Sequence, residues 1–171
     1  QHWSPEKPYL YNFEIISGKD RAQSYFALRT VTIENVKGQN YICLNGKPTF
    51  FHGLLDQGYF SDGIYTPASP TCYTEDILAM KSLGFNMLRK HIKTEPMRWY
   101  YHCDRLGMLL MDEAFDVWNK RKFVTHDYHI FFREWWQRDI EAMVKRDRNH
   151  ACVLSYSIGN EIYEIDCTSQ G

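Results

Sequence analysis

The sequence lacks the features that mark several large classes of protein. No apolar run approaches the roughly 18 residues of a membrane-spanning helix, and no basic-then-apolar leader follows Gln1. The 20 basic and 21 acidic side chains leave a formal charge of −1. With neither sign in excess, we expect neither nucleic acid nor a membrane as a partner.

Paired cysteines, nucleotide-binding glycine loops and Gly-x-Ser-x-Gly elbows are also missing. The 5 cysteines are an odd number, are widely spaced and form no Cys-x-x-Cys motif. This pattern predicts reduced, structural thiols rather than a disulfide framework or a zinc site. On cysteine usage alone a cytoplasmic location is favoured, while a secreted or periplasmic one stays compatible with the sequence. The cysteines are Cys43, Cys72, Cys103, Cys152 and Cys167.

Two kinds of pattern divide the chain. Residues 9–16 and 24–34 are rich in aromatic and β-branched side chains, which predicts strands, and Asn45-Gly46 predicts a tight hairpin. From residue 50 onward, apolar runs at 50–56, 85–89, 108–111 and 152–158 alternate with helical patterns at 74–83, 96–106 and 128–148. Short apolar strands that alternate with amphipathic helices predict a parallel sheet covered by helices, hence an α/β fold.

Polar residues follow each apolar run of this second part. They are Asp56 and Gln57, then Arg89 to Lys93, then Asp112 and Glu113, and finally Asn160 and Glu161. Because α/β folds bind ligands at the carboxyl ends of parallel strands, these positions are the candidate site.

Glu161 is the leading candidate for a general acid, since burial at the end of a strand can raise the pKa of a carboxyl group. An acidic residue in the first turn of a helix is an equally good explanation of its position. Arg89 has the geometry to hold a carboxylate with two hydrogen bonds, and a structural ion pair would explain it as well. Trp118 follows the third run and is a candidate for stacking on a sugar, whereas Trp136 is predicted to lie in the core.

The histidines of His126-x-x-His129 have the spacing of a metal pair, but no third ligand lies nearby in the sequence. A solvated loop is therefore the favoured interpretation of this segment.

An ordered set of motifs resembles family 2 of the glycoside hydrolases, the β-galactosidase and β-glucuronidase group. The resemblance covers almost the whole chain. The motifs are Trp3-Ser4-Pro5-Glu6, Leu44-Asn45-Gly46-Lys47-Pro48, Gly84-Phe85-Asn86-Met87-Leu88-Arg89, Cys103-Asp104-Arg105-Leu106-Gly107, Asp112-Glu113-Ala114, and Arg146-Asp147-Arg148-Asn149-His150 running to Ser157-Ile158-Gly159-Asn160-Glu161.

This resemblance implies a TIM barrel, (β/α)₈, preceded by an immunoglobulin-like sandwich. Residues 1–36 would be the last strands of the sandwich, and residues 37–171 the first half of the barrel. Since such a barrel takes about 250 residues, the sequence is expected to be a fragment whose partners include the remainder of the barrel. A homo-oligomer is compatible with the sequence, no cofactor is expected, and the sequence leaves a structural or activating divalent cation open.

The implied activity is that of a retaining exo-β-glycosidase, β-galactosidase-like, acting on terminal β-linked sugars. Glu161 would be the acid/base and Asn160 would bind the sugar 2-hydroxyl. Arg89 would orient a nucleophilic glutamate located beyond residue 171. The remaining expected substrate contacts are Asp56, His91, Asp112 and Trp118. Alternatives are a β-glucuronidase, another family 2 specificity, or a catalytically silent carbohydrate-binding segment.

Overall fold

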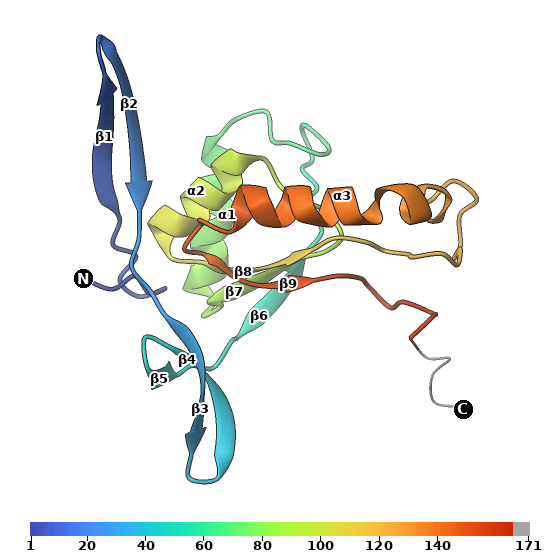
Figure 1. The fold of residues 1–171 in the computed structure, drawn as a ribbon, viewed down its shortest axis with the longest axis horizontal. Coiled ribbons are helices and arrows are strands. Elements are labelled where there is room, and N and C mark those ends of the chain that lie inside the picture. The colour runs from blue at the N-terminus through green and yellow to red at the C-terminus, as the bar shows by residue number, and fades with distance from the viewer. Residues whose placement is uncertain (166–171) are drawn as a thin grey trace.

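The structure, a computed structural model, describes residues 1–165 (Figure 1). An antiparallel amino-terminal part precedes a layer of parallel strands and helices. The elements in chain order are β1 (Tyr11–Ser17), β2 (Asp20–Phe26), β3 (Val31–Val36), β4 (Gln39–Leu44), β5 (Lys47–Pro48), β6 (Gly53–Asp56), α1 (Thr71–Ser82), β7 (Met87–Lys90), α2 (Met97–Leu106), β8 (Leu109–Glu113), α3 (His129–Asp147) and β9 (Val153–Ser157).

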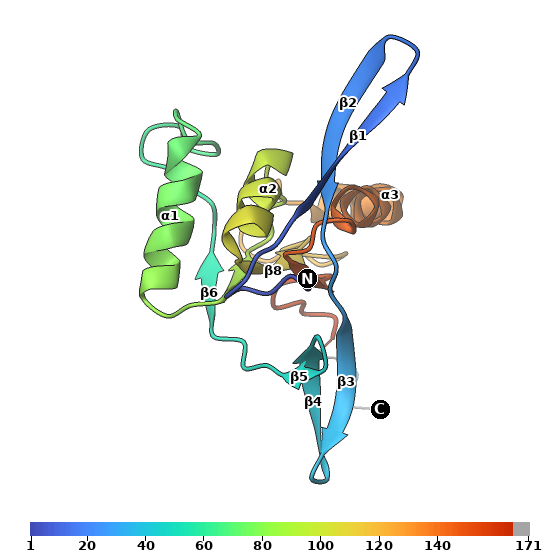
Figure 2. The same cartoon turned by 90° about the vertical axis from the view of Figure 1, so that its left-hand side faces the viewer.

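The amino-terminal strands form two antiparallel sheets that project in different directions from the rest of the molecule (Figures 1 and 2). One is the β1–β2 hairpin and the other has the order β3-β4-β5. The prediction of one strand over residues 24–34 is wrong, because β2 and β3 belong to different sheets. Two contacts with distant parts of the chain hold the segment between β2 and β3 in place. The amide of Trp3 donates to Leu28 O at 2.8 Å, and the guanidinium of Arg29 donates to Val153 O in β9.

The turn predicted at Asn45-Gly46 is confirmed. Both residues are left-handed, with φ of 53° and 73°, as a two-residue hairpin turn requires. The boundary expected between residues 36 and 37 falls between two paired strands, because β3 and β4 form a hairpin in which Val36 pairs with Gln39.

The second part is a parallel sheet of order β6-β7-β8-β9, as the alternating pattern predicted. Helices α1, α2 and α3 cover one face of this sheet, and among the described residues no helix covers the other (Figures 1 and 2). Four neighbouring parallel strands with helices on one side are half of a (β/α)₈ barrel, whose interior would be the uncovered face.

Helix boundaries follow the expected signals with one correction. Pro96 precedes α2, and Gly107 ends it in the left-handed conformation with φ of 77°. Helix α3 matches the predicted 128–148 closely. Helix α1 begins at Thr71 rather than Thr74, since Pro70 already holds a helical φ of −59° and the helix starts directly after it.

The core lies between the helices and the sheet. It combines large side chains of α1 and α2 with consecutive apolar residues of β7 and β8, and Trp3 from the amino terminus is also fully buried in it. Burying one such side chain contributes about 1.5–3 kcal/mol. The prediction that Trp136 lies in the core is wrong: it is 44% exposed and stacks on Phe132 at the surface of α3, where no later element of the described chain covers it.

Cys43, Cys72, Cys103 and Cys152 are free thiols, as predicted, while Cys167 lies outside the described residues. Burial raises the pKa of the Cys103 and Cys152 thiols well above the usual range, which keeps them protonated and unreactive.

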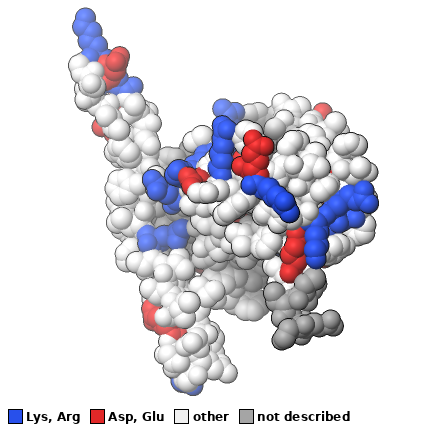
Figure 3. Space-filling model, turned by 45° about the vertical axis from the view of Figure 1, so that its right-hand side comes forward, with Lys and Arg blue, Asp and Glu red and all other residues white. Residues whose placement is uncertain are grey.

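Charges of both signs are interspersed over the face shown in Figure 3. Within the described residues, no helix combines the length and the apolar character needed to cross a membrane.

Candidate active site

Side chains from three parallel strands and the segments that follow them converge at the carboxyl edge of the sheet. Arg89 lies in β7, Glu113 ends β8, Ser157 ends β9, and Asn160 follows β9. Arg89 and Glu113 point to the uncovered face, because consecutive strand residues point to opposite faces and their neighbours Lys90 and Asp112 contact groups on the helix side.

Arg89 and Glu113 form a two-point ion pair. The Nε and Nη2 atoms of Arg89 donate to Glu113 Oε2 at 2.9 Å and Oε1 at 3.0 Å. The hydroxyl of Ser157 donates to Glu113 Oε2 at 2.8 Å. Glu113 is 1% exposed, so a buried carboxylate has its charge balanced and its oxygens bonded.

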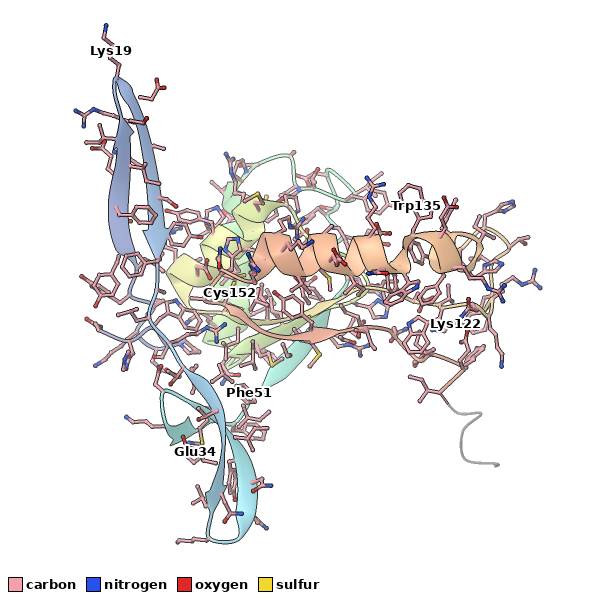
Figure 4. The ribbon with its side chains drawn as sticks, in the orientation of Figure 1. Lys19, Glu34, Phe51, Lys122, Trp135 and Cys152 are labelled. Carbon is pink, nitrogen blue, oxygen red and sulfur yellow. The ribbon has the colours of Figure 1, made fainter. Side chains whose placement is uncertain are left out.

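Asn160 joins this pair to a second charged group. Arg89 Nη2 donates to Asn160 Oδ1 at 2.8 Å, and Asn160 Nδ2 donates to Asp116 Oδ1 at 2.8 Å. Lys122 Nζ donates to the same Asp116 oxygen at 2.8 Å and also to the carbonyl of Asn160. Figure 4 shows Lys122 in the loop that leads from β8 to α3, at the same end of the molecule as the carboxyl end of β9.

Asp116 is held in its ionised form by these contacts. Desolvation by burial would raise its pKa, but the hydrogen bonds from Lys122 and Asn160 outweigh that effect. The positive charge of Lys122 and the nearby His91 act in the same direction, and the pKa of Asp116 is lowered.

Glu161 directly follows Asn160 and is exposed, so the burial expected for its carboxyl group is wrong for the described chain. Its φ of 50° is left-handed, which turns the chain sharply after the strand. The turn is tight: a Cβ placed on Gly159 would lie 2.4 Å from Ile162 Cγ1 and 3.1 Å from Trp118 Nε1. The general acid predicted from the sequence is therefore an accessible carboxyl group beside a firmly held amide.

Two predicted substrate contacts lie at the edge of the site. The carboxylate of Asp56 accepts a hydrogen bond from Lys90 Nζ at 2.7 Å and one from the amide of Gly58 at 2.7 Å. The main-chain amide of His91 donates to Asp56 O at 3.0 Å. His91 also lines a small hollow of about 250 Å³ with Tyr59 and Tyr65. The carboxylate of Asp56 thus holds the loop after β6, while the half-buried His91 lines this hollow.

Asp112 is not part of this cluster. It is fully buried on the helix side of the sheet, where the hydroxyl of Tyr100 in α2 donates to its Oδ1 at 2.7 Å. Desolvation raises the pKa of Asp112 well above the usual range of a carboxyl group, and the neighbouring Asp147 adds to that effect. Glu113, its neighbour in the sequence, is the residue that reaches the uncovered face.

Trp118 lies beside the site, with its indole Nε1 donating to Ile158 O at 2.9 Å and its ring stacked on Phe132. The described residues contain no group of three or more His, Cys, Asp and Glu side chains placed to hold a metal ion. His129 contacts Asp127 rather than a second histidine.

Three residues of this hydrogen-bond network were not predicted from the sequence: Ser157, Asp116 and Lys122. Ser157 was visible as the last polar residue of its strand, and Asp116 as an acidic residue shortly after Glu113. No sequence signal marks Lys122, which stands among other charged residues of a long loop.

Comparisons with known proteins show the family and the fold of the chain. The family described as "Glycosyl hydrolases family 2, TIM barrel domain" matches residues 34–169. A β-galactosidase of Bacteroides ovatus, BoGH2A, is 34% identical over 96% of this chain and 19% of its own length. A putative β-glucuronidase of Formosa agariphila is 34% identical over 94% of this chain and 16% of its own length.

A solved glycosyl hydrolase family 2 member from Bacteroides cellulosilyticus superposes with a TM-score of 0.83 at 32% identity. The match covers 95% of this chain and 21% of that structure. The chain therefore spans about a fifth of the length of the relatives that it matches.

Proposed function

The chain belongs to family 2 of the glycosyl hydrolases, and from that membership we propose that it is part of a retaining exo-β-glycosidase of the β-galactosidase type. The observation that carries the proposal is the arrangement of Arg89, Glu113 and Asn160 at the carboxyl edge of a half-barrel, directly before Glu161. Active sites of such barrels lie at this edge.

In the proposed reaction, Glu161 protonates the leaving-group oxygen of the glycoside and later removes a proton from the water that completes hydrolysis. Its exposure suits a group that must meet both a substrate and water. Asn160 binds the 2-hydroxyl of the sugar, a contact that strengthens in the transition state. Arg89 positions the carboxylate that attacks the anomeric carbon.

A retaining mechanism needs a second carboxyl group about 5–5.5 Å from the acid. Glu113 is a poor candidate, because Arg89 and Ser157 occupy both of its oxygens. The nucleophile is therefore proposed to come from the remainder of the barrel, outside residues 1–171. Among residues 1–165, strands β6 and β9 each have one neighbour in the sheet, which leaves an edge on both for further strands of the barrel.

The domain assignment belongs to the same proposal. Residues 1–36 would be the last strands of an immunoglobulin-like sandwich and residues 37–171 the first half of the barrel. The β1–β2 hairpin supports an all-β part before the barrel (Figure 2), whereas the β3-β4-β5 sheet lies on both sides of the proposed boundary.

The substrate class proposed is a terminal β-linked sugar. The name of the Bacteroides ovatus relative favours a β-galactoside, and that of the Formosa agariphila relative favours a β-glucuronide as the second candidate. A panel of aryl β-glycosides assayed with the enzyme that carries this chain distinguishes the two. Absence of turnover with every member would instead support a silent carbohydrate-binding segment.

The role of Glu161 is tested by Glu161→Gln in that enzyme. Glutamine cannot donate an acidic proton, so turnover of glycosides with poor leaving groups should collapse, by about 10²–10⁴-fold. Activated aryl glycosides need little protonation of the leaving group and should lose much less in the glycosylation step. Equal losses on both kinds of substrate, with glycosylation shown to be rate-limiting, would contradict the role.

A further inference from the structure

The side-chain amide of Asn160 is held at both ends by charged groups. Arg89 donates to its oxygen and Asp116 accepts from its nitrogen, both at 2.8 Å. Arginine has no acceptor atom and a carboxylate has no donor, so the two partners together determine which end of the amide carries the oxygen. The amide therefore has one orientation, with one Nδ2 hydrogen left for a ligand.

Asp116 is itself fixed by an almost fully buried ammonium group. The side chain of Lys122 is 4% exposed, and its Nζ donates both to Asp116 Oδ1 and to the carbonyl of Asn160. The lysine therefore holds the carboxylate and the backbone of Asn160 at the same time. A second backbone contact, from the amide of Asn160 to Phe115 O at 2.7 Å, fixes the residue from the β8 side.

Without Asp116, the two groups beside the amide would both be donors, Arg89 at one end and Lys122 at the other. The amide oxygen could then bond to either cation, and the amide would lose its single orientation. A carboxylate at this position is what keeps the nitrogen on the side facing Lys122.

We propose that Asp116 is a positioning residue for glycoside hydrolysis, which turns the amide of Asn160 so that its remaining N–H meets the 2-hydroxyl of the sugar. The inference rests on the proposed function, and it adds a specific role for a residue of the loop after β8. Removal of a single well-placed donor to the transition state typically costs about 10²–10³-fold in rate.

The test compares two substrates that differ only at the 2-hydroxyl. In the enzyme that carries this chain, Asp116→Ala should lower kcat/KM for p-nitrophenyl β-galactoside about 100-fold. For p-nitrophenyl 2-deoxy-β-galactoside it should leave kcat/KM close to the wild-type value, because that sugar has no 2-hydroxyl to lose. If the panel shows β-glucuronides to be preferred, the glucuronide and its 2-deoxy counterpart replace this pair.

Asp116→Asn keeps an oxygen that accepts from Asn160, so it should restore most of the lost activity and serves as the second variant if Asp116→Ala does not fold. Any loss in Asp116→Asn must likewise be confined to the substrate with the 2-hydroxyl. The matched control is Asp139→Ala, another half-buried aspartate, whose carboxylate accepts from Tyr128 on the helix side. It should leave both substrates unaffected.

Equal losses on the two substrates, or no loss with either, would overturn the positioning role while leaving the proposed function intact. A wild-type enzyme that hydrolyses no aryl β-glycoside would overturn the proposed function and this role together. The two failures are thus distinguishable by the wild-type measurement alone.

Discussion

Replacement of Arg89 by alanine should destabilise the barrel, because it leaves a buried carboxylate without its counter-charge. Glu113 is 1% exposed and accepts three hydrogen bonds, two from Arg89 and one from Ser157. Arg89→Ala removes two of the three bonds together with the positive charge. Among the described residues, Arg89 is the cation that contacts this carboxylate, so its removal leaves the charge of Glu113 without a partner.

The size of the effect follows from this burial. Removing one partner of a buried pair costs about 3–5 kcal/mol, since the desolvation of the other charge is no longer compensated. The side chain of Arg89 is 36% exposed, so water can reach the vacated position and the cost should fall at the lower end, about 3 kcal/mol. For a domain of barrel size, about 2–4 °C of melting temperature corresponds to each kcal/mol. The expected shift is therefore about 6–12 °C.

Thermal unfolding of the protein that carries this chain, scanned at one fixed rate, measures this shift. Arg21→Ala is the matched control, because Arg21 pairs with Glu14 at 2.8 Å on the exposed β1–β2 hairpin and such surface pairs contribute about 0–1 kcal/mol. Adding Glu113→Gln to Arg89→Ala should recover most of the loss, since the amide carries no charge to desolvate. The reasoning is refuted if the two arginine variants shift the melting temperature equally, or if Glu113→Gln brings no recovery.

Three further outcomes are expected. Gly107→Ala should lower the melting temperature by several degrees, because Gly107 has φ of 77° and an added Cβ would lie 2.3 Å from the backbone oxygen of Pro5; calorimetry showing no shift would contradict this. Burial beside Asp147 raises the pKa of Asp112, so the folded state holds a proton that the unfolded chain releases, and stability falls as pH rises through that raised pKa. Asp112→Asn needs no proton and should flatten this decline, which lies between the ordinary carboxyl pKa of about 3.9 and the raised pKa of about 7; parallel urea midpoints for the two proteins between about pH 4 and 7 would count against it. This chain on its own should hydrolyse aryl β-galactosides no faster than its Glu161→Gln variant, because it supplies one of the two carboxyl groups needed, and a measurably higher rate would reveal a nucleophile within it.

Much of the fold could be predicted because its signals are local. Gly107 ends α2, Asn45-Gly46 turns the β4–β5 hairpin, and apolar runs alternate with helical patterns in the parallel part. Each of these depends on residues within a few positions of one another. The break between β2 and β3 could not be predicted in the same way, because it depends on contacts of Leu28 and Arg29 with distant parts of the chain.

The sequence could not predict which residues of the parallel strands point to the helix side and which to the uncovered side. Strands buried on both faces are almost continuously apolar, so they carry no alternation to show which residues point inward. Residues 108–111 are all apolar, so no alternation distinguished Glu113 from Asp112, the residue that the sequence predicted to contact the substrate. The structure separates them: Asp112 contacts Tyr100 on the helix side, while Glu113 contacts Arg89 on the uncovered side.

The neighbours of Asn160 depend on tertiary structure alone. Asp116 is 44 positions away in the sequence and Lys122 is 38, and no periodicity links residues at such distances. What brings them together is the parallel order β7-β8-β9, which places the carboxyl ends of three strands side by side. The resemblance of the sequence could therefore predict which residues would bind a sugar, whereas the residues that hold Asn160 in place become visible only once the strands are neighbours.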